Sequence, residues 1–392
     1  MTGACSMQSD HTRPVGSADG LRVVFAGGGS GGHLYPTLSI ADALRRSGSD
    51  VSVRFFCTHR AIDRRVLDAA GWAAIVQPVL PFPSRIGCVI PFWRAWRRSV
   101  RYCRAEFAVR RPDVVIGSGG FASGPAVVVA ARMGIPTAVL NPDAQPGRAN
   151  RFLARRVQLV LAQWPESWEH FPAGSVVRVV GCPIRRQFAV ADRARGIVRF
   201  GLDRACRTLL VTGASQGSHS VNRAMMLLAE RIGRLRQWQV LHLTGGDDRT
   251  AVQTAYTNAG VRHVCRAYTD EMADALAASD LVISRAGAST LAEITAVGRA
   301  SILLPYPYDR HQHQVLNAKV LGVAGAARVC GLLTDAERIA DVLGEQIVAL
   351  TRDDAMRDAM ARRCRDMGKP DAATRAVMEI NALVEQRRKA VA

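Results

Sequence analysis

Short apolar runs recur along the chain, and most are followed by a turn of small residues and then by a segment with helical spacing. The runs lie at 22–26, 51–56, 113–116, 136–140, 157–162, 208–212, 239–244, 263–266, 281–284 and 300–304. Runs of this length bounded by turn residues predict buried strands. Because strands that alternate with helices form parallel sheets, we expect an α/β protein with a parallel sheet in each half.

Residues 176–180 are expected to form a last strand of the first half, and Gly181 and Pro183, which follow it, indicate a boundary. We therefore expect a flexible extension at 1–20, an N-terminal domain at 21–182 and a C-terminal domain at 183–367. Helices of the C-terminal domain are expected at 219–235, 248–259, 270–278, 290–297 and 313–324. A last helix at 368–388 has apolar residues at helical spacing, and we expect it to pack back on the N-terminal domain.

The 392 residues carry a formal net charge of +19, and nearly all of the positive charge is arginine. Such a balance favours polyanions or anionic membranes as partners. No apolar run approaches the ~18 residues that a membrane-spanning helix needs, and the polar first twenty residues do not resemble a signal peptide. The nine cysteines are scattered without a Cys-x-x-Cys pair, which indicates reduced core residues of a cytoplasmic protein.

Four turns rich in glycine or small residues stand where a predicted strand meets a predicted helix. They span 27–33, 117–125, 213–217 and 284–293. Ligands of open α/β sheets bind at this end of the strands, and N–H groups at helix starts can hold phosphates. Two turns lie in each half, which predicts two lobes facing each other across a cleft. After the first turn, Pro36 is expected at the first helical position.

The turn at 284–293 suggests a nucleotide ligand. Glu293 is expected in the first turn of the next helix, where its carboxylate can accept hydrogen bonds from both ribose hydroxyls. The plainer alternative is an ordinary helix start with an acidic first turn. In the turn at 213–217, Ser215 is expected to help hold a phosphate.

Two familiar motifs fit poorly. Residues 27–32 satisfy G-x-G-x-x-G, but a nicotinamide enzyme needs an acidic residue at the end of the second strand, where this chain has Phe-Phe-Cys-Thr-His at 55–59. Residues 213–217 satisfy G-x-S-x-G, but no acid and histidine follow at the separate loops that a hydrolase triad requires. A dehydrogenase and a hydrolase are therefore both disfavoured.

Polar side chains at two further places are candidates for chemistry. His33 closes the first turn, where its imidazole is either a proton acceptor or a hydrogen-bonding cap of the loop. His313, Gln314 and Asn317 cluster at the start of a later helix and match the hydroxyls of a sugar. Because no carboxylate pair accompanies these histidines, no metal site is expected.

The connection at 78–112 combines aromatic residues with arginines. Its members include Phe92, Trp93, Arg94, Trp96, Arg97, Arg98 and Arg101. Such a pattern is typical of a helix that lies in a membrane interface. The alternative is a crossover helix that packs its aromatic face on its own sheet. We expect membrane contact, since the charge is denser than a solvated face requires.

Five ordered motifs together resemble a known family. They are Gly-Gly-Ser-Gly-Gly-His33-x-x-Pro36, Gly-x-x-x-Ser-Gly-Pro125, Gly-x-Ser-Gln-Gly217, Ser-x-x-Gly-Ala-x-Thr-x-x-Glu293 and His313-Gln-x-x-Asn-Ala318. Over about residues 21–388 the chain resembles the MurG family of UDP-N-acetylglucosamine (UDP-GlcNAc) transferases of bacterial peptidoglycan synthesis, in glycosyltransferase family 28. The resemblance implies the GT-B architecture, two Rossmann-like doubly wound domains facing each other across the active site.

The resemblance also implies a reaction. Family enzymes move GlcNAc from UDP-GlcNAc to the C4 hydroxyl of MurNAc in lipid I, the MurNAc-pentapeptide on undecaprenyl diphosphate, and make lipid II with inversion. They use no cofactor and no metal in the transfer site. They are peripheral proteins at the cytoplasmic face of the cell inner membrane, so an anionic membrane surface is an expected partner. Other cell-wall synthesis proteins are further expected partners, and nucleic acid is not.

By position, the resemblance implies substrate-binding roles for one group of residues, with Glu293 at the ribose and Thr269 at the uracil. The group is Ser30, Gly31, Gly32, Asp143, Arg185, Ser215, Gln216, Thr269, Ala288, Ser289, Thr290, Glu293, His313, Gln314 and Asn317. Family members carry His-Glu-Gln-Asn where this chain has Leu-Asn-Pro-Asp at 140–143. The catalytic base is therefore open between His33 and Asp143.

Other functions remain as alternatives. Another GT-B UDP-sugar transferase or a UDP-GlcNAc epimerase would share the donor site, but an epimerase would need no lipid acceptor. A basic nucleic-acid-binding protein would need a cationic face with stacking aromatics and no nucleotide pocket. The four phosphate-type turns argue against it.

Overall fold

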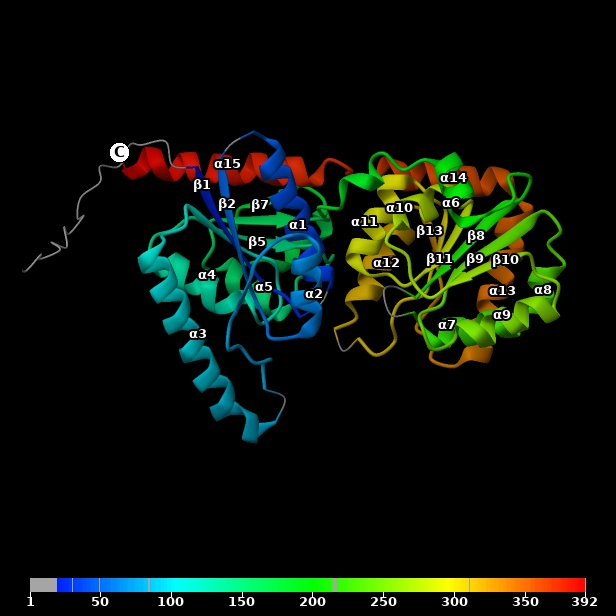
Figure 1. Cartoon of the computed structure of the whole chain (residues 1–392), viewed down its shortest axis with the longest axis horizontal. Coiled ribbons are helices and arrows are strands. Elements are labelled where there is room, and N and C mark those ends of the chain that lie inside the picture. Colours follow the sequence, from blue (N-terminus) through cyan, green and yellow to red (C-terminus); the bar gives the residue numbers. More distant parts are fainter. Residues whose placement is uncertain are drawn as a thin grey trace, which may run out of the picture.

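The computed structural model describes residues 20–29, 31–48, 50–83, 85–213, 217–309 and 311–391. The described strands form two parallel sheets, one with strand order β3-β2-β1-β4-β5-β6-β7 and the other with order β10-β9-β8-β11-β12-β13. Figure 1 shows the two sheets as separate lobes with helices on both faces of each. The prediction of two parallel-sheet α/β lobes is confirmed. The predicted extension at 1–20 lies almost wholly outside the described residues.

The first sheet contains the strands β1 (Leu21–Ala26), β2 (Val51–Cys57), β3 (Ala74–Val76), β4 (Val114–Gly117), β5 (Thr137–Asn141), β6 (Leu159–Ala162) and β7 (Val177–Val179). Its helices are α1 (Gly31–Arg46), α2 (Ala61–Ala69), α3 (Val89–Val109), α4 (Ser123–Arg132) and α5 (Arg148–Ala154), with 3-10 turns η1 (Ile86–Cys88) and η2 (Pro165–His170). In β1, Val23 and Phe25 join the core on one face, while Val24 and Ala26 join the core on the other. A strand buried on both faces needs a continuous apolar run, which is the pattern seen in the sequence.

The second sheet contains β8 (Arg207–Thr212), β9 (Trp238–Leu243), β10 (His263–Arg266), β11 (Leu281–Ser284), β12 (Ser301–Leu303) and β13 (Ala327–Val329). Its helices are α6 (Arg193–Phe200), α7 (His219–Leu227), α8 (Ala229–Gly233), α9 (Arg249–Asn258), α10 (Met272–Ala278), α11 (Ala288–Val297), α12 (His313–Val323), α13 (Ala336–Arg352) and α14 (Asp354–Asp366), with the 3-10 turn η3 (Arg186–Phe188) before α6. The same alternation occurs in β11, where Val282 faces one core and Ile283 the other.

The structure corrects several local predictions. The edge strands β3 and β13 were not predicted, and each has only three residues, of which at most one is buried. The helix predicted at 219–235 is divided at Leu228 into α7 and α8. Helix α1 begins at Gly31, so Pro36 is its sixth residue and not its first. The ring of Pro36 removes the N–H that would bond the carbonyl of Gly32, and Gly32 is solvent-exposed, so water can replace that donor.

Helix α15 (Ala372–Val391) returns from the second lobe to the first and lies along α1. Figure 1 shows it in red across the top of the N-terminal lobe. Ala376 and Ile380 are fully buried in the same core as Leu38 and Leu44 of α1. The last helix of the chain is therefore part of the core of the first lobe.

Ile380→Ala is expected to lower the free energy of unfolding by about 2–5 kcal/mol, because it leaves a cavity between α15 and α1. Met378→Ala removes a side chain of the same helix that is exposed, and should change stability by no more than ~0.5 kcal/mol. Urea denaturation followed by tryptophan fluorescence measures both. Equal stability of the Ile380→Ala variant and the wild type would contradict this packing.

Candidate active site

A hollow of about 490 Å³ lies between the two lobes, at the carboxyl ends of the strands. Most of the predicted substrate-binding residues line it, although they come from six separate segments. Those that line it are Gly31, Gly32, His33, Asp143, Arg185, Thr269, Ala288, Ser289, Thr290, Glu293 and Gln314. His313 and Asn317 lie next to it and join the lobes. Ser30, Ser215 and Gln216 lie outside the described residues.

The N-terminus of α11 opens into this hollow. Gly287 is its N-cap residue, and no side chain caps the first turn. Ala288, Ser289 and Thr290 form that turn and line the hollow. Since the first N–H groups of a helix have no partner within the helix and carry a partial positive charge, this turn can bind a diphosphate.

Glu293 is the sixth residue of α11, so its predicted place in the first turn is wrong. Its side chain is only 18% exposed, and its Oε1 lies 3.9 Å from Nη2 of Arg185. Burial raises the pKa of Glu293 to about 7, against the opposing effect of the Arg185 charge. A buried carboxylate with one distant cation has free acceptor capacity, which two ribose hydroxyls would satisfy.

His33 has a defined orientation in the facing lobe. Its Nδ1 lies 3.0 Å from the carbonyl oxygen of Ser118, so Nδ1 carries the hydrogen and Nε2 is left as an acceptor. Gly119 and Gly120 lie against the ring with φ of +92° and +72°, and a Cβ at Gly119 would approach the ring to 3.3 Å. Burial lowers the pKa of His33, and the nearby charge of Asp143 acts in the opposite direction. A neutral imidazole with a free Nε2 can accept a proton.

Asp143 is held from the other lobe by Asn317, which is fully buried. The Nδ2 of Asn317 donates to Oδ1 of Asp143 at 2.9 Å, and its Oδ1 accepts from the N–H of Ala144 at 2.8 Å. His313 lies beside this contact, with Nδ1 3.1 Å from the carbonyl oxygen of Gln145. His313 and Asn317 were expected at the sugar. Both instead bind residues 143–145 of the other lobe.

Arg285 was missed by the sequence analysis although it immediately follows β11. Its guanidinium is buried and donates to the carbonyl oxygens of Leu304 and Pro305 and to the hydroxyls of Ser218 and Ser220, at 2.8–3.2 Å. Burial lowers the pKa of Arg285. The side chain fixes the loops after β8, β11 and β12 against one another.

Two tyrosines in the hollow were also missed. Tyr35 lies in α1, with its ring 5.4 Å from the guanidinium carbon of Arg185. Tyr268 precedes Thr269, and its hydroxyl donates to Asp270 at 3.1 Å. Burial, with a further contribution from Tyr35, raises the pKa of Tyr268 to about 12. The position of Tyr35 one helical turn after Gly31 was the available signal.

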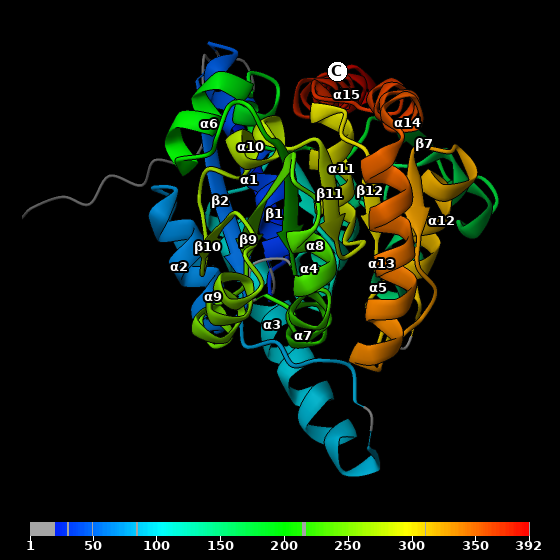
Figure 2. The same cartoon turned by 90° about the vertical axis from the view of Figure 1, so that its right-hand side faces the viewer.

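Helix α3 projects below both lobes, as Figure 2 shows. Ser99, Cys103 and Phe107 bury one face of its second half, and Trp96 packs at Gly124 of α4. A group of exposed apolar residues lies near the start of α3. Four of them, Phe82, Ile86, Ile90 and Trp93, define what we call the α3 tip.

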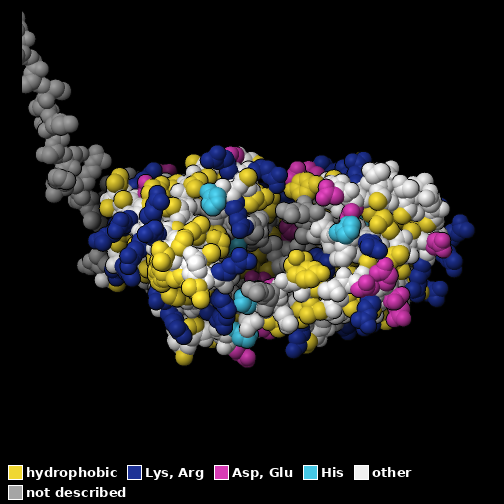
Figure 3. Space-filling view, turned by 90° about the horizontal axis from the view of Figure 1, so that it is seen from below, with side chains coloured by type: hydrophobic (Ala, Val, Ile, Leu, Met, Phe, Trp, Pro, Cys, Tyr) yellow, Lys and Arg dark blue, Asp and Glu magenta, His cyan; other side chains and the backbone are white. Residues whose placement is uncertain are grey.

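The α3 tip is bordered by arginines. Arg85, Arg94, Arg97 and Arg98 are charged neighbours of these apolar residues along the chain, and all four are exposed. In Figure 3 an apolar patch with blue side chains at its rim is visible under the N-terminal lobe. Of the seven residues predicted to contact a membrane, Trp93 belongs to the tip, whereas Trp96 is half-buried against α4. None of the helices in the described ranges is long and apolar enough to span a bilayer.

The raised pKa of Glu293 makes stability depend on pH. Below about pH 4.5 the carboxyl is protonated in both the folded and the unfolded chain, so its stabilising contribution is fully present, and it is lost as the pH rises through about 7. The difference between the ordinary pKa of 4.5 and the raised pKa of about 7 corresponds to a loss of roughly 3 kcal/mol in the free energy of unfolding.

Chemical denaturation of the wild type and Glu293→Gln at pH 5 and pH 8 measures this loss. The variant is expected to gain stability relative to the wild type on going to pH 8, because its amide side chain does not ionise. If the free energies of unfolding of the two proteins differed by the same amount at pH 5 and pH 8, the raised pKa of Glu293 would be contradicted.

Comparison with known proteins agrees with this geometry. Residues 23–162 match the glycosyltransferase family 28 N-terminal domain, and residues 208–376 match the family's C-terminal domain. The UDP-N-acetylglucosamine–N-acetylmuramyl-(pentapeptide) pyrophosphoryl-undecaprenol N-acetylglucosamine transferase of Halothermothrix orenii is 35% identical over 360 residues, which cover 89% of this chain and 95% of that protein. That of Clavibacter sepedonicus is 37% identical, with coverages of 90% and 94%.

The fold is also shared with solved structures. The crystal structure of Acinetobacter baumannii MurG superimposes with a TM-score of 0.73 at 24% identity, covering 92% of this chain and 99% of that one. The chain belongs to glycosyltransferase family 28, and within it to the MurG family of N-acetylglucosamine transferases.

Proposed function

We propose that this protein transfers GlcNAc from UDP-GlcNAc to the C4 hydroxyl of MurNAc in lipid I, giving lipid II with inversion. The observation that carries the proposal is the hollow between the lobes, where the uncapped N-terminus of α11 and Glu293 face a neutral His33. The C-terminal domain, residues 183–367, binds the donor. The N-terminal domain, residues 21–182, binds the acceptor and the membrane.

The donor is held by its nucleoside and its diphosphate. Glu293 accepts hydrogen bonds from the ribose hydroxyls, and Thr269 lies at the uracil. The N–H groups of Ala288, Ser289 and Thr290 bind the diphosphate, on which negative charge grows as UDP leaves. Helix dipole and amides stabilise that charge without a metal or a cofactor. Arg185 lies beside Glu293 and adds a cation next to the nucleotide.

On the acceptor side, His33 is the general base. Its Nδ1–H donates to the carbonyl oxygen of Ser118, which leaves Nε2 to take the proton of the C4 hydroxyl as that oxygen attacks C1 of GlcNAc. Asp143, also in the hollow, favours the imidazolium that forms. Because Asn317 holds one oxygen of Asp143, this carboxylate orients and stabilises, while the imidazole moves the proton.

A transfer assay with labelled UDP-GlcNAc and a lipid I analogue tests these roles. His33→Ala is expected to lower kcat by about 10²–10⁴ with little change in KM for the donor. Glu293→Ala should raise KM for UDP-GlcNAc roughly 5- to 150-fold, the equivalent of about 1–3 kcal/mol. Asp143→Asn should retain more activity than His33→Ala.

His311→Ala is the matched control, since His311 is exposed and does not line the hollow. An unchanged donor KM in Glu293→Ala would contradict the ribose assignment. UDP-GlcNAc 2-epimerase from Neisseria meningitidis shares the fold, with a TM-score of 0.64 at 14% identity over 92% of this chain and all of that one. UDP formed without any acceptor, together with an epimerised sugar, would therefore favour an epimerase.

The acceptor is lipid-linked, and the α3 tip suits a membrane surface. Ile86 and Ile90 are 93% and 65% exposed, and the surrounding arginines match anionic headgroups. We infer a peripheral protein at the cytoplasmic face of the cell membrane that inserts the tip beside its substrate.

Ile90→Asp is expected to weaken binding to phosphatidylglycerol vesicles at least tenfold, because an isoleucine contributes about 1.5–3 kcal/mol when it leaves water. Val109→Asp makes the same kind of change at the opposite end of α3, where the side chain is 90% exposed, and should leave binding unaltered. Co-sedimentation measures both variants. If both variants lost vesicle binding equally, the net charge of the protein and not the α3 tip would account for the binding.

A further inference from the structure

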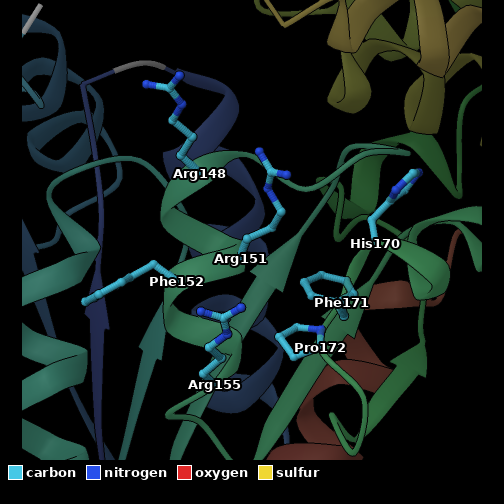
Figure 4. A pocket seen from close by; sticks show the side chains of 7 residues that line it. All are labelled: Arg148, Arg151, Phe152, Arg155, His170, Phe171 and Pro172. Atoms are coloured by element: carbon cyan, nitrogen blue, oxygen red, sulfur yellow. The ribbon is translucent and has the colours of Figure 1, made fainter.

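A second hollow of about 490 Å³ lies on the N-terminal lobe, outside the cleft. One wall is helix α5 with its C-cap residue, which contribute Arg148, Arg151 and Arg155. The other wall is the end of η2 and the residues after it. Figure 4 shows the arginines on one side and His170, Phe171 and Pro172 on the other. No acidic residue is among the described residues that line it.

Arg148 and Arg151 lie in α5 and Arg155 is its C-cap residue, and their spacing by three and four residues places them on one side of the helix. Like charges at this spacing weaken a helix, and Arg148, the first helical residue, is also a cation at the positive end of the helix. The helix has no acidic residue in its first turn that would offset this charge. Glu166 and Glu169 of η2 are close in sequence to His170 but do not line the hollow. An anionic ligand would relieve this repulsion.

The floor of the hollow is apolar. Phe171 is buried, and Phe152 lies at the edge with the guanidinium of Arg156 stacked 3.9 Å from its ring centre. Arginine forks beside aromatic rings bind carboxylates in a bidentate manner and contact neighbouring apolar groups. The hollow therefore suits a ligand that carries both carboxylates and apolar side chains, as a short acidic peptide does.

The hollow is within reach of the cleft. Asp143 lines the cleft, and Arg148 follows five residues later, so their Cα atoms are no more than about 18 Å apart. A peptide of five residues spans up to about 17 Å when extended. The relatives' name places a pentapeptide on the muramyl sugar that receives GlcNAc. A peptide that leaves the acceptor sugar in the cleft can therefore end on α5.

We propose that the hollow formed by Arg148, Arg151 and Arg155 binds the carboxylates of the acceptor's stem peptide. The inference rests on the proposed function and adds a recognition site for the peptide outside the cleft. A lipid headgroup is the less suitable occupant, because Figures 1 and 2 show the α3 tip projecting beyond the level of α5.

The test compares two water-soluble acceptor analogues with short prenyl chains, one with free peptide carboxylates and one with amidated carboxylates. Wild type is expected to have about a tenfold lower KM for the free-carboxylate analogue. The double variant Arg151→Ala/Arg155→Ala should lose this preference by raising that KM about tenfold. Its kcat and its KM for UDP-GlcNAc should stay within about twofold of the wild-type values.

Arg64→Ala/Arg65→Ala is the matched control, since it removes two exposed arginines of α2 that do not line the hollow. This variant should keep the preference for carboxylates. Thermal unfolding of the Arg151/Arg155 variant should match the wild type, which separates lost recognition from lost folding. An equal KM change for both analogues, or none for either, would overturn the inference.

Two further measurements separate the remaining explanations. If the Arg151/Arg155 variant keeps its carboxylate preference but no longer binds phosphatidylglycerol vesicles, the hollow is a headgroup site and the inference is wrong. Calorimetric binding of the two analogues without donor is independent of turnover. Carboxylate-dependent binding that the double variant abolishes would support the inference even if wild type transferred no sugar, a result that would reject only the proposed reaction.

Discussion

The arrangement of the active site depends on one buried amide. Asn317 satisfies both of its polar ends on residues about 174 positions earlier in the chain, Asp143 and Ala144. Leaving a buried amide unsatisfied would cost about 1–3 kcal/mol, so the two lobes are held together where their loops meet. The contact of His313 with Gln145 reinforces it. The contact also fixes the place of Asp143 in the cleft.

Within that cleft, burial favours the uncharged form of both an acid, Glu293, and a base, His33. It raises the pKa of Glu293 and lowers the pKa of His33, so both side chains are driven toward their uncharged forms near neutral pH. Positive charge comes instead from the end of α11, from Arg185 and from Arg285, which lies behind the loops. An environment of this kind favours a ligand that brings its own negative charge, as a nucleoside diphosphate does.

The proposed acceptor has three chemically different parts, and the N-terminal lobe offers three different surfaces. The apolar α3 tip with its arginine border suits the lipid, and the cleft with His33 suits the sugar. The arginine face of α5 suits the carboxylates of the peptide. Part of the high net positive charge is therefore concentrated on two of these surfaces, the α3 tip and α5, where arginines lie beside apolar groups.

The sequence by itself determined the alternation of strands and helices and the four turns at the strand ends, because these depend on neighbouring residues. It also singled out Glu293, His33 and Asp143 as residues for one site, and all three line the hollow. Only the tertiary structure decided that Asn317 joins the lobes, that Tyr35 and Tyr268 meet in the cleft, and that Trp96 packs on α4 while Ile86 and Ile90 remain exposed. Those outcomes depend on contacts between segments far apart in the chain, and no local pattern of hydrophobicity or charge encodes which distant surface a side chain will meet.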